Sequence, residues 1–217
     1  MENQAYKSTG ISLVVGSLLI IATMVLHPSG GSMERIIAIS KTITFAHALA
    51  IFCMPIVLFG FYGLTMKLMD SMKLSVLAFF TLVFGCIAAM FAALINGLTV
   101  PYFLGQYADR LEKNSVVLSS ILDYSFAINK PLDYIFIVSF CLAIAIYSIV
   151  IIRTDRFPKW LGYFGMLFII FVTIGALAGF VFTSLTGFRI IVFSLAGWIL
   201  SAGFLIVKPI KKRKEIQ

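Results

Sequence analysis

Charged residues are scarce in this chain. Aspartate, glutamate, lysine and arginine together make up 12% of its 217 residues, about half of the share that is usual in a water-soluble domain. Hydrophobic residues make up 61%. This balance excludes a soluble globular protein, because the chain has too few polar side chains to cover the surface of such a fold.

Cysteine is also rare. The three cysteines, Cys53, Cys86 and Cys141, each lie inside an apolar stretch, and no two of them have a CxxC spacing. Free thiols in such stretches behave as small hydrophobic groups. We therefore expect neither a disulfide nor a thiolate metal site.

Motifs of familiar enzyme chemistry are missing as well. The chain has no HExxH, GxSxG, P-loop, dinucleotide-binding glycine pattern or CxxCH haem-attachment motif. Its two histidines with one nearby carboxylate are few for catalytic zinc, which usually has three protein ligands. We expect no metal and no cofactor, and a non-enzymatic role is favoured over an enzyme.

Long apolar runs are what the chain does have. Six of them, each near the roughly 20 residues that cross a bilayer as a helix, cover about 9–26, 42–64, 74–100, 131–152, 158–182 and 188–207. Helices satisfy their own backbone hydrogen bonds in lipid. The sequence predicts an all-α, polytopic transmembrane bundle of six spans that forms one domain over 1–217. The first run lacks a signal-peptide cleavage pattern and is expected to remain a span.

The positions of lysine and arginine predict the orientation. Most of the 17 lie on one side if the termini and the second and fourth loops share that side: Lys7, Lys67, Lys73, Arg153, Arg156, Lys159, Lys208, Lys211, Lys212, Arg213 and Lys214. Cytoplasmic loops hold such an excess, so both termini are predicted to be cytoplasmic in a multi-pass plasma-membrane protein. This charge distribution explains the basic composition without nucleic acid. The basic run 211–214 is a candidate for binding anionic lipid.

The loop 101–130 is the only long connection between spans. Its first part is expected to continue the third span past Pro101, and 114–128 carries apolar residues at near-helical spacing. That pattern suits an interfacial helix over the outer mouth of the bundle. Surface cover is favoured over a gate. Small-residue pairs such as Gly175 and Gly179 suit helix packing and leave the oligomeric state open.

Polar side chains gather at one depth, near the outer ends of the spans. They are His27, His47, Asn96, Asp133 and Arg189, from five different spans or their ends. Ionisable groups within spans are costly, face the bundle interior and often mark a site. We predict that these residues converge on an outward-facing pocket that binds or passes a small molecule, an ion or a lipid headgroup.

Four of these residues also have a structural interpretation. His27 before Pro28 suits a helix end, Asp133 suits a first helical turn, Asn96 can bond a neighbouring helix, and Arg189 can be a flanking charge. Two other functions stay open. One is an embedded enzyme or redox carrier, with His47 as base or metal ligand, Asp133 orienting it and Asn96 as a polar stabiliser, or a haem held by the two histidines. The other is an accessory subunit without a ligand.

Three short motifs resemble those of a group of small bacterial six-span membrane proteins whose activity is not settled. The first span ends in His27-Pro28, and His47 precedes Pro55 and the stretch Leu58-Phe59-Gly60-Phe61-Tyr62-Gly63-Leu64. The fifth span begins with Pro158-Lys159-Trp160-Leu161-Gly162. The resemblance implies a bacterial inner-membrane location and a single six-helix bundle. It implies no reaction.

Overall fold

The computed structural model describes residues 2–70 and 72–208, and all regular elements of these residues are helices. In chain order they are α1 (Glu2–Leu26), α2 (Met33–Ala38), α3 (Ser40–Met69), α4 (Leu74–Ala92), the π-helix η1 (Ala93–Thr99), α5 (Val100–Gly105), the 3-10 helix η2 (Ala108–Arg110), α6 (Leu111–Arg153), α7 (Lys159–Leu177) and α8 (Leu185–Val207). The basic run 211–214 lies outside the described residues.

Six helical segments are long and apolar enough to cross a membrane: Tyr6–Leu26, Ser40–Met69, Leu74–Gly105, Ala108–Arg153, Lys159–Leu177 and Leu185–Val207. The prediction of an all-α bundle with six spans is confirmed. Pro101 occupies the first turn of α5, where a missing backbone N–H costs little, so α4, η1 and α5 run on as one span. The chain is an integral, multi-pass membrane protein.

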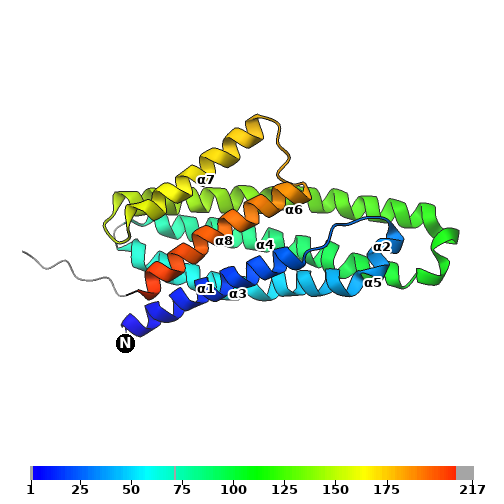
Figure 1. Ribbon diagram of the computed structural model, residues 1–217, viewed down its shortest axis with the longest axis horizontal. Coiled ribbons are helices and arrows are strands. Elements are labelled where there is room, and N and C mark those ends of the chain that lie inside the picture. Colours follow the sequence, from blue (N-terminus) through cyan, green and yellow to red (C-terminus); the bar gives the residue numbers. More distant parts are fainter. Residues whose placement is uncertain (1, 71, 209–217) are drawn as a thin grey trace, which may run out of the picture.

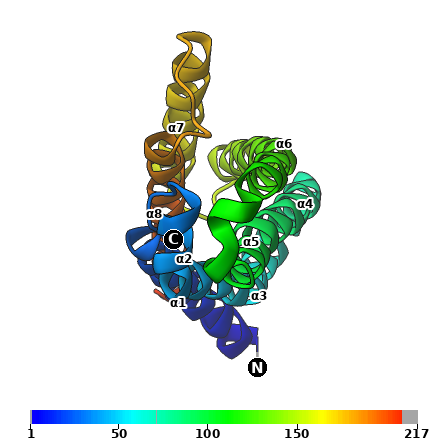
Figure 2. The ribbon, with the colours of Figure 1, turned by 90° about the vertical axis from the view of Figure 1, so that its right-hand side faces the viewer.

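The long helices run up and down alongside one another (Figure 1). α1 packs between α3 and α8, α4 packs on α6, and α7 packs mainly on α6. The start of α1 and the end of α8 lie at the same end of the bundle, here called the terminal end. The opposite end, here called the capped end, carries α2, α5 and the first half of α6 (Figures 1 and 2).

The prediction for the segment 101–130 was wrong in one respect. Residues 114–128 are helical, but they form the first half of α6, which continues through Pro131 without a break. Proline favours the first turn of a helix, so the sequence suggested a start there. The packing of α6 against α4, η1 and α7 stabilises the helix enough for it to continue through Pro131. At 43 residues, α6 is roughly 64 Å long, about twice the thickness of the hydrocarbon layer.

The capped end has a small hydrophobic core of its own. It consists of Ile36, Ile43, Val100, Leu104, Leu118 and Leu122, which come from α2, α3, α5 and α6. Burial of these side chains holds the extension of α6 against α5 and α2. The segment 101–130 is therefore a packed helical cap rather than a loop.

The helix α7 ends at Leu177, before the predicted 182. Gly179 follows with φ of 83°, a left-handed conformation in which glycine commonly terminates helices. Gly175 and Gly179 therefore do not share a helix face, and the proposed GxxxG packing motif is wrong. The far half of α7 leans away from α8 (Figures 1 and 2), and Leu177 there is 85% exposed.

An aromatic layer fills the bundle toward its terminal end. The rings of Phe61, Tyr147 and Trp198 are fully buried, with centroids 5.6 Å apart for Phe61 and Tyr147 and 6.3 Å apart for the other two pairs. Trp198 Nε1 donates to the Leu161 carbonyl at 3.0 Å, and the hydroxyls of Tyr147 and Thr65 share a hydrogen bond of 2.6 Å. Both polar tips are thus satisfied inside the apolar core.

Candidate functional site

A cavity of about 390 Å³ lies between α1, α3, α4, η1, α6 and α8, near the capped end. Most of its wall is apolar. The side chains on it with polar or sulfur atoms are Thr23, His27, Cys53, His47, Cys86, Asn96, Asn129, Asp133 and Thr183, with methionines at 24 and 54. A mainly apolar cavity with a few convergent polar groups is the usual form of a small-molecule site.

The structure brings four of the five predicted residues together. His27, His47, Asn96 and Asp133 all line the cavity. Arg189 is not among the lining residues. Its guanidinium donates to the His27 carbonyl at 3.1 Å and so ties the first turn of α8 to the end of α1. That these residues bind a ligand stays a prediction.

His47 projects from α3 with one nitrogen fixed. Its Nδ1 lies 2.8 Å from the Ile43 carbonyl, and because a carbonyl only accepts, Nδ1 carries the proton in the neutral ring. Nε2 is then left with a free lone pair. The ring packs closely on Gly97 of η1, where a Cβ would overlap the His47 side chain. The glycine thus allows the imidazole to lie on the backbone of the neighbouring helix.

His27 follows the last residue of α1 and contacts His47. The ring centroids are 4.7 Å apart, and Nδ1 of His27 lies 3.1 Å from the Pro28 carbonyl, which again leaves Nε2 as an acceptor. Burial, and secondarily the neighbouring His47 and the Arg189 charge, lower the pKa of His27 to about 4. The two imidazoles lie against each other on one wall, and each leaves Nε2 as an acceptor.

This shift predicts a pH dependence of stability. The folded protein protonates His27 only near pH 4, whereas the unfolded chain does so near pH 6.5, so acid favours unfolding between these values. In detergent-purified protein, we expect the midpoint of thermal unfolding to fall as the pH drops from 6.5 to 4, and His27→Gln to flatten that fall. Parallel curves for the variant and the wild type would contradict this assignment.

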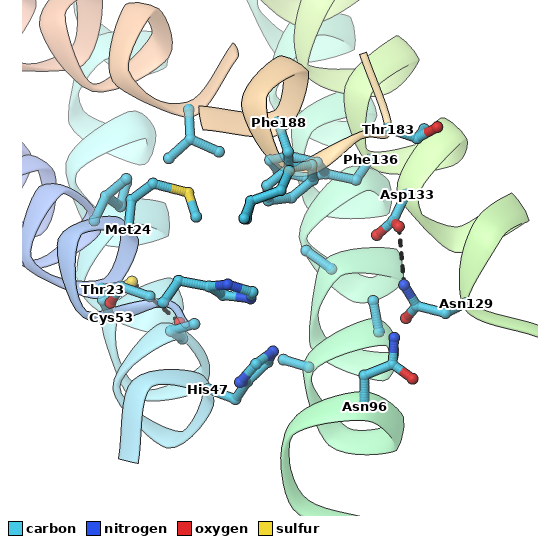
Figure 3. Close-up of a pocket in the computed structure, with 18 of the residues that line it drawn as sticks. Thr23, Met24, His47, Cys53, Asn96, Asn129, Asp133, Phe136, Thr183 and Phe188 are labelled. Carbon is cyan, nitrogen blue, oxygen red and sulfur yellow. Dashed lines mark hydrogen bonds between the residues drawn. The ribbon is translucent and has the colours of Figure 1, made fainter. Parts of the chain in front are cut away.

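The facing wall is formed by η1 and α6 (Figure 3). Asn129 Nδ2 donates to Asp133 Oδ2 at 2.9 Å, and this bond orients the amide so that Asn129 Oδ1 is free. Asn96 Oδ1, Asn129 Oδ1 and Thr23 Oγ1 are buried, and no protein group of the described residues bonds to them. Such atoms cost about 1–3 kcal/mol each when they lack a partner, so a ligand that bonds them gains that much.

Sequence analysis missed Asn129 and Thr23. Asn129 lies one turn before Asp133 on the same face of α6, and the expectation that a helix began at Pro131 hid this relationship. Thr23 likewise precedes His27 by four residues, but α1 ends at Leu26, so the two residues do not belong to one helix. The π-helical geometry of η1, which positions Asn96, left no signal in the sequence. Such wide turns occur often at functional sites.

The geometry does not suit a haem between the two histidines. Rings 4.7 Å apart are in direct contact, and axial ligands must lie on opposite faces of the macrocycle. The described residues also contain no group of three or more histidine, cysteine or acidic side chains that could hold a metal ion. The predicted pairing of Asp133 with His47 is absent as well, because their side chains bond to Asn129 and Ile43.

The cavity ends at the aromatic layer. Its deepest lining residues on α3 and α6 are Val57 and Phe140, and Phe61 and Tyr147 follow them toward the terminal end. On α8 the lining reaches Ile199, next to Trp198. Between α6 and α8 the side is closed by Phe136 and Phe188, whose ring centroids are 5.5 Å apart. The cavity therefore lies in the part of the bundle between the capped end and the aromatic layer.

Comparison with known proteins finds no match among family models, curated proteins or solved structures. The fold and the cavity define the class: an integral membrane protein with six helical segments able to cross the membrane and an internal cavity. The function has to be argued from that pocket.

Proposed function

We propose that this protein binds a small amphipathic molecule in the cavity between α1, α3, η1, α6 and α8. The observation that carries the proposal is the convergence of His27, His47, Asn96 and Asp133 on one mainly apolar cavity of about 390 Å³. These residues come from four separate parts of the chain. A bundle that needed only to pack would fill such a space with apolar side chains.

We place the protein in a bacterial plasma membrane with both termini in the cytoplasm. The excess of lysine and arginine that the sequence has in the termini and in the second and fourth loops supports this orientation, as does the location of the start of α1 and the end of α8 at one end. The resemblance to small bacterial six-span proteins supports the assignment to a bacterial plasma membrane. In this orientation the capped end and its cavity face the extracytoplasmic side.

Binding is favoured over passage and over catalysis. The layer of Phe61, Tyr147 and Trp198 separates the cavity from the terminal end, so a polar path across the bundle is lacking among the described residues. Catalysis usually needs several acid and base groups within hydrogen-bonding reach of one another. Here the imidazole of His47 and the carboxylate of Asp133 lie on facing walls (Figure 3).

The test is native mass spectrometry of detergent-purified wild type and His47→Ala, with an absorbance spectrum and elemental analysis. We expect a stoichiometric small molecule that binds the variant about 5- to 150-fold more weakly, because one lost hydrogen bond to a buried partner costs about 1–3 kcal/mol. Thr173→Val is the control, since this exposed hydroxyl bonds only its own helix on α7. Clean apo protein in all three samples would instead favour an accessory role.

A further inference from the structure

Most of the unpartnered polar atoms of the cavity are hydrogen-bond acceptors. They are Nε2 of His27 and His47, Oδ1 of Asn96 and Asn129, and the second carboxylate oxygen of Asp133. The amide nitrogen of Asn96 is a donor, and the hydroxyls of Thr23 and Thr183 can act either way. A molecule that pairs with the acceptors has to supply donors. Ligands that carry only acceptors, such as carboxylates and phosphates, leave these atoms unsatisfied.

The formal charge on the cavity wall has one sign. Asp133 is the only charged side chain among the lining residues, and lysine and arginine are absent from that set. No ion pair of Asp133 exists among the described residues, where its one hydrogen-bond donor is the neutral amide of Asn129. A half-buried carboxylate without a counter-charge attracts a cation more strongly than the same group in water does.

Aromatic rings lie beside this carboxylate. Phe136 follows Asp133 by three residues on the same face of α6, and Phe188 of α8 contacts Phe136 (Figure 3). The faces of aromatic rings attract organic cations. The rest of the cavity is lined by aliphatic side chains such as Ile20, Met54 and Val192, which suit an apolar body.

We propose that the ligand of this cavity is a lipophilic amine, bound as its ammonium ion against Asp133 with its apolar part among the aliphatic and aromatic side chains. This inference rests on the proposed function, since it specifies the ligand class of the same pocket. A metal cation fits less well, because the described residues lack a cluster of three ligating side chains. An anionic headgroup fits least, because it would meet Asp133 and a wall of acceptors.

The test compares three probes that differ at one end: 2-phenylethylamine, 2-phenylethanol and phenylacetate. Their binding to the detergent-purified full chain is measured by equilibrium dialysis at neutral pH. We expect the amine to bind at least about tenfold more tightly than the alcohol, because a charge-assisted hydrogen bond exceeds a neutral one by at least that factor, and phenylacetate to bind weakest. Asp133→Asn should lower the affinity for the amine much more than that for the alcohol and so remove the preference for the amine.

Asp123→Asn is the matched control, because Asp123 is an exposed acid on the same helix. Asp133→Glu keeps the charge and should keep the preference. If Asp133→Asn does not fold, Phe136→Leu serves instead and should lower amine affinity more than alcohol affinity. Saturable binding of the alcohol without a preference for the amine would overturn the ligand class and leave the pocket intact. Absence of saturable binding for all three probes would overturn the ligand class and count against the pocket itself.

Discussion

Replacing Trp198 by alanine is expected to lower the free energy of unfolding by about 3–5 kcal/mol, the usual cost of deleting a large buried aromatic side chain. The indole is fully buried, stacks on Phe61 at 6.3 Å and donates to the Leu161 carbonyl. The substitution leaves a void between α3, α6 and α8 and a carbonyl without its donor. Thermal unfolding in detergent, followed by circular dichroism, measures the effect.

The second tryptophan provides the control. Trp160 lies in the first turn of α7 and is 50% exposed, so Trp160→Ala should shift the unfolding midpoint by much less. Trp198→Phe keeps the ring contacts and loses the N–H, and it should fall between the two. Equal shifts for Trp198→Ala and Trp160→Ala would show that the aromatic layer does not hold the bundle together.

Gly97→Ala adds a single methyl group and is expected to disrupt the cavity. Alanine normally stabilises a helix relative to glycine, but a Cβ at this position would overlap the Cβ and the ring of His47. Either α3 and η1 move apart or His47 leaves its hydrogen bond to Ile43. Overpacking of this kind costs about 1–3 kcal/mol, and we expect the affinity for the ligand to fall about as much as in His47→Ala.

A double variant separates the steric effect from other causes. Gly97→Ala combined with His47→Gly removes the clash with both the Cβ and the ring, so the loss of stability in the pair should be smaller than the sum of the two single losses. Gly105→Ala is the control, because a Cβ at this position meets no atom within 4 Å. Additive losses in the double variant would show that Gly97 does not act through His47.

Much of the fold could be predicted from hydropathy alone, because a bilayer tolerates few structures other than long apolar helices. The errors have local causes. Pro131 suggested a helix start, although tertiary contacts with α4 and η1 carry α6 through it. Gly179 was predicted to be a packing residue within the helix, although its left-handed backbone lies just after the end of α7. Such outcomes depend on neighbouring helices that periodicity does not reveal.

The candidate site was predicted in part. The depth of His27, His47, Asn96 and Asp133 along their spans was enough to group them, since polar side chains in lipid turn toward one another. Arg189 shares that depth, but it bonds the His27 backbone instead of lining the cavity. Depth along a helix is readable from sequence, whereas the direction around its axis depends on packing.

The sequence by itself determined that the protein lies in a bilayer, how many spans it has and at which depth along the spans its polar groups lie. Each of these follows from composition and from spacing along single helices. Only the tertiary structure decided which of those groups meet. It turned η1 into a π-helix that points Asn96 inward, used Gly97 to admit His47, and extended α6 so that Asn129 reaches Asp133. These contacts join residues from different helices, and their geometry is set by how the helix backbones pack.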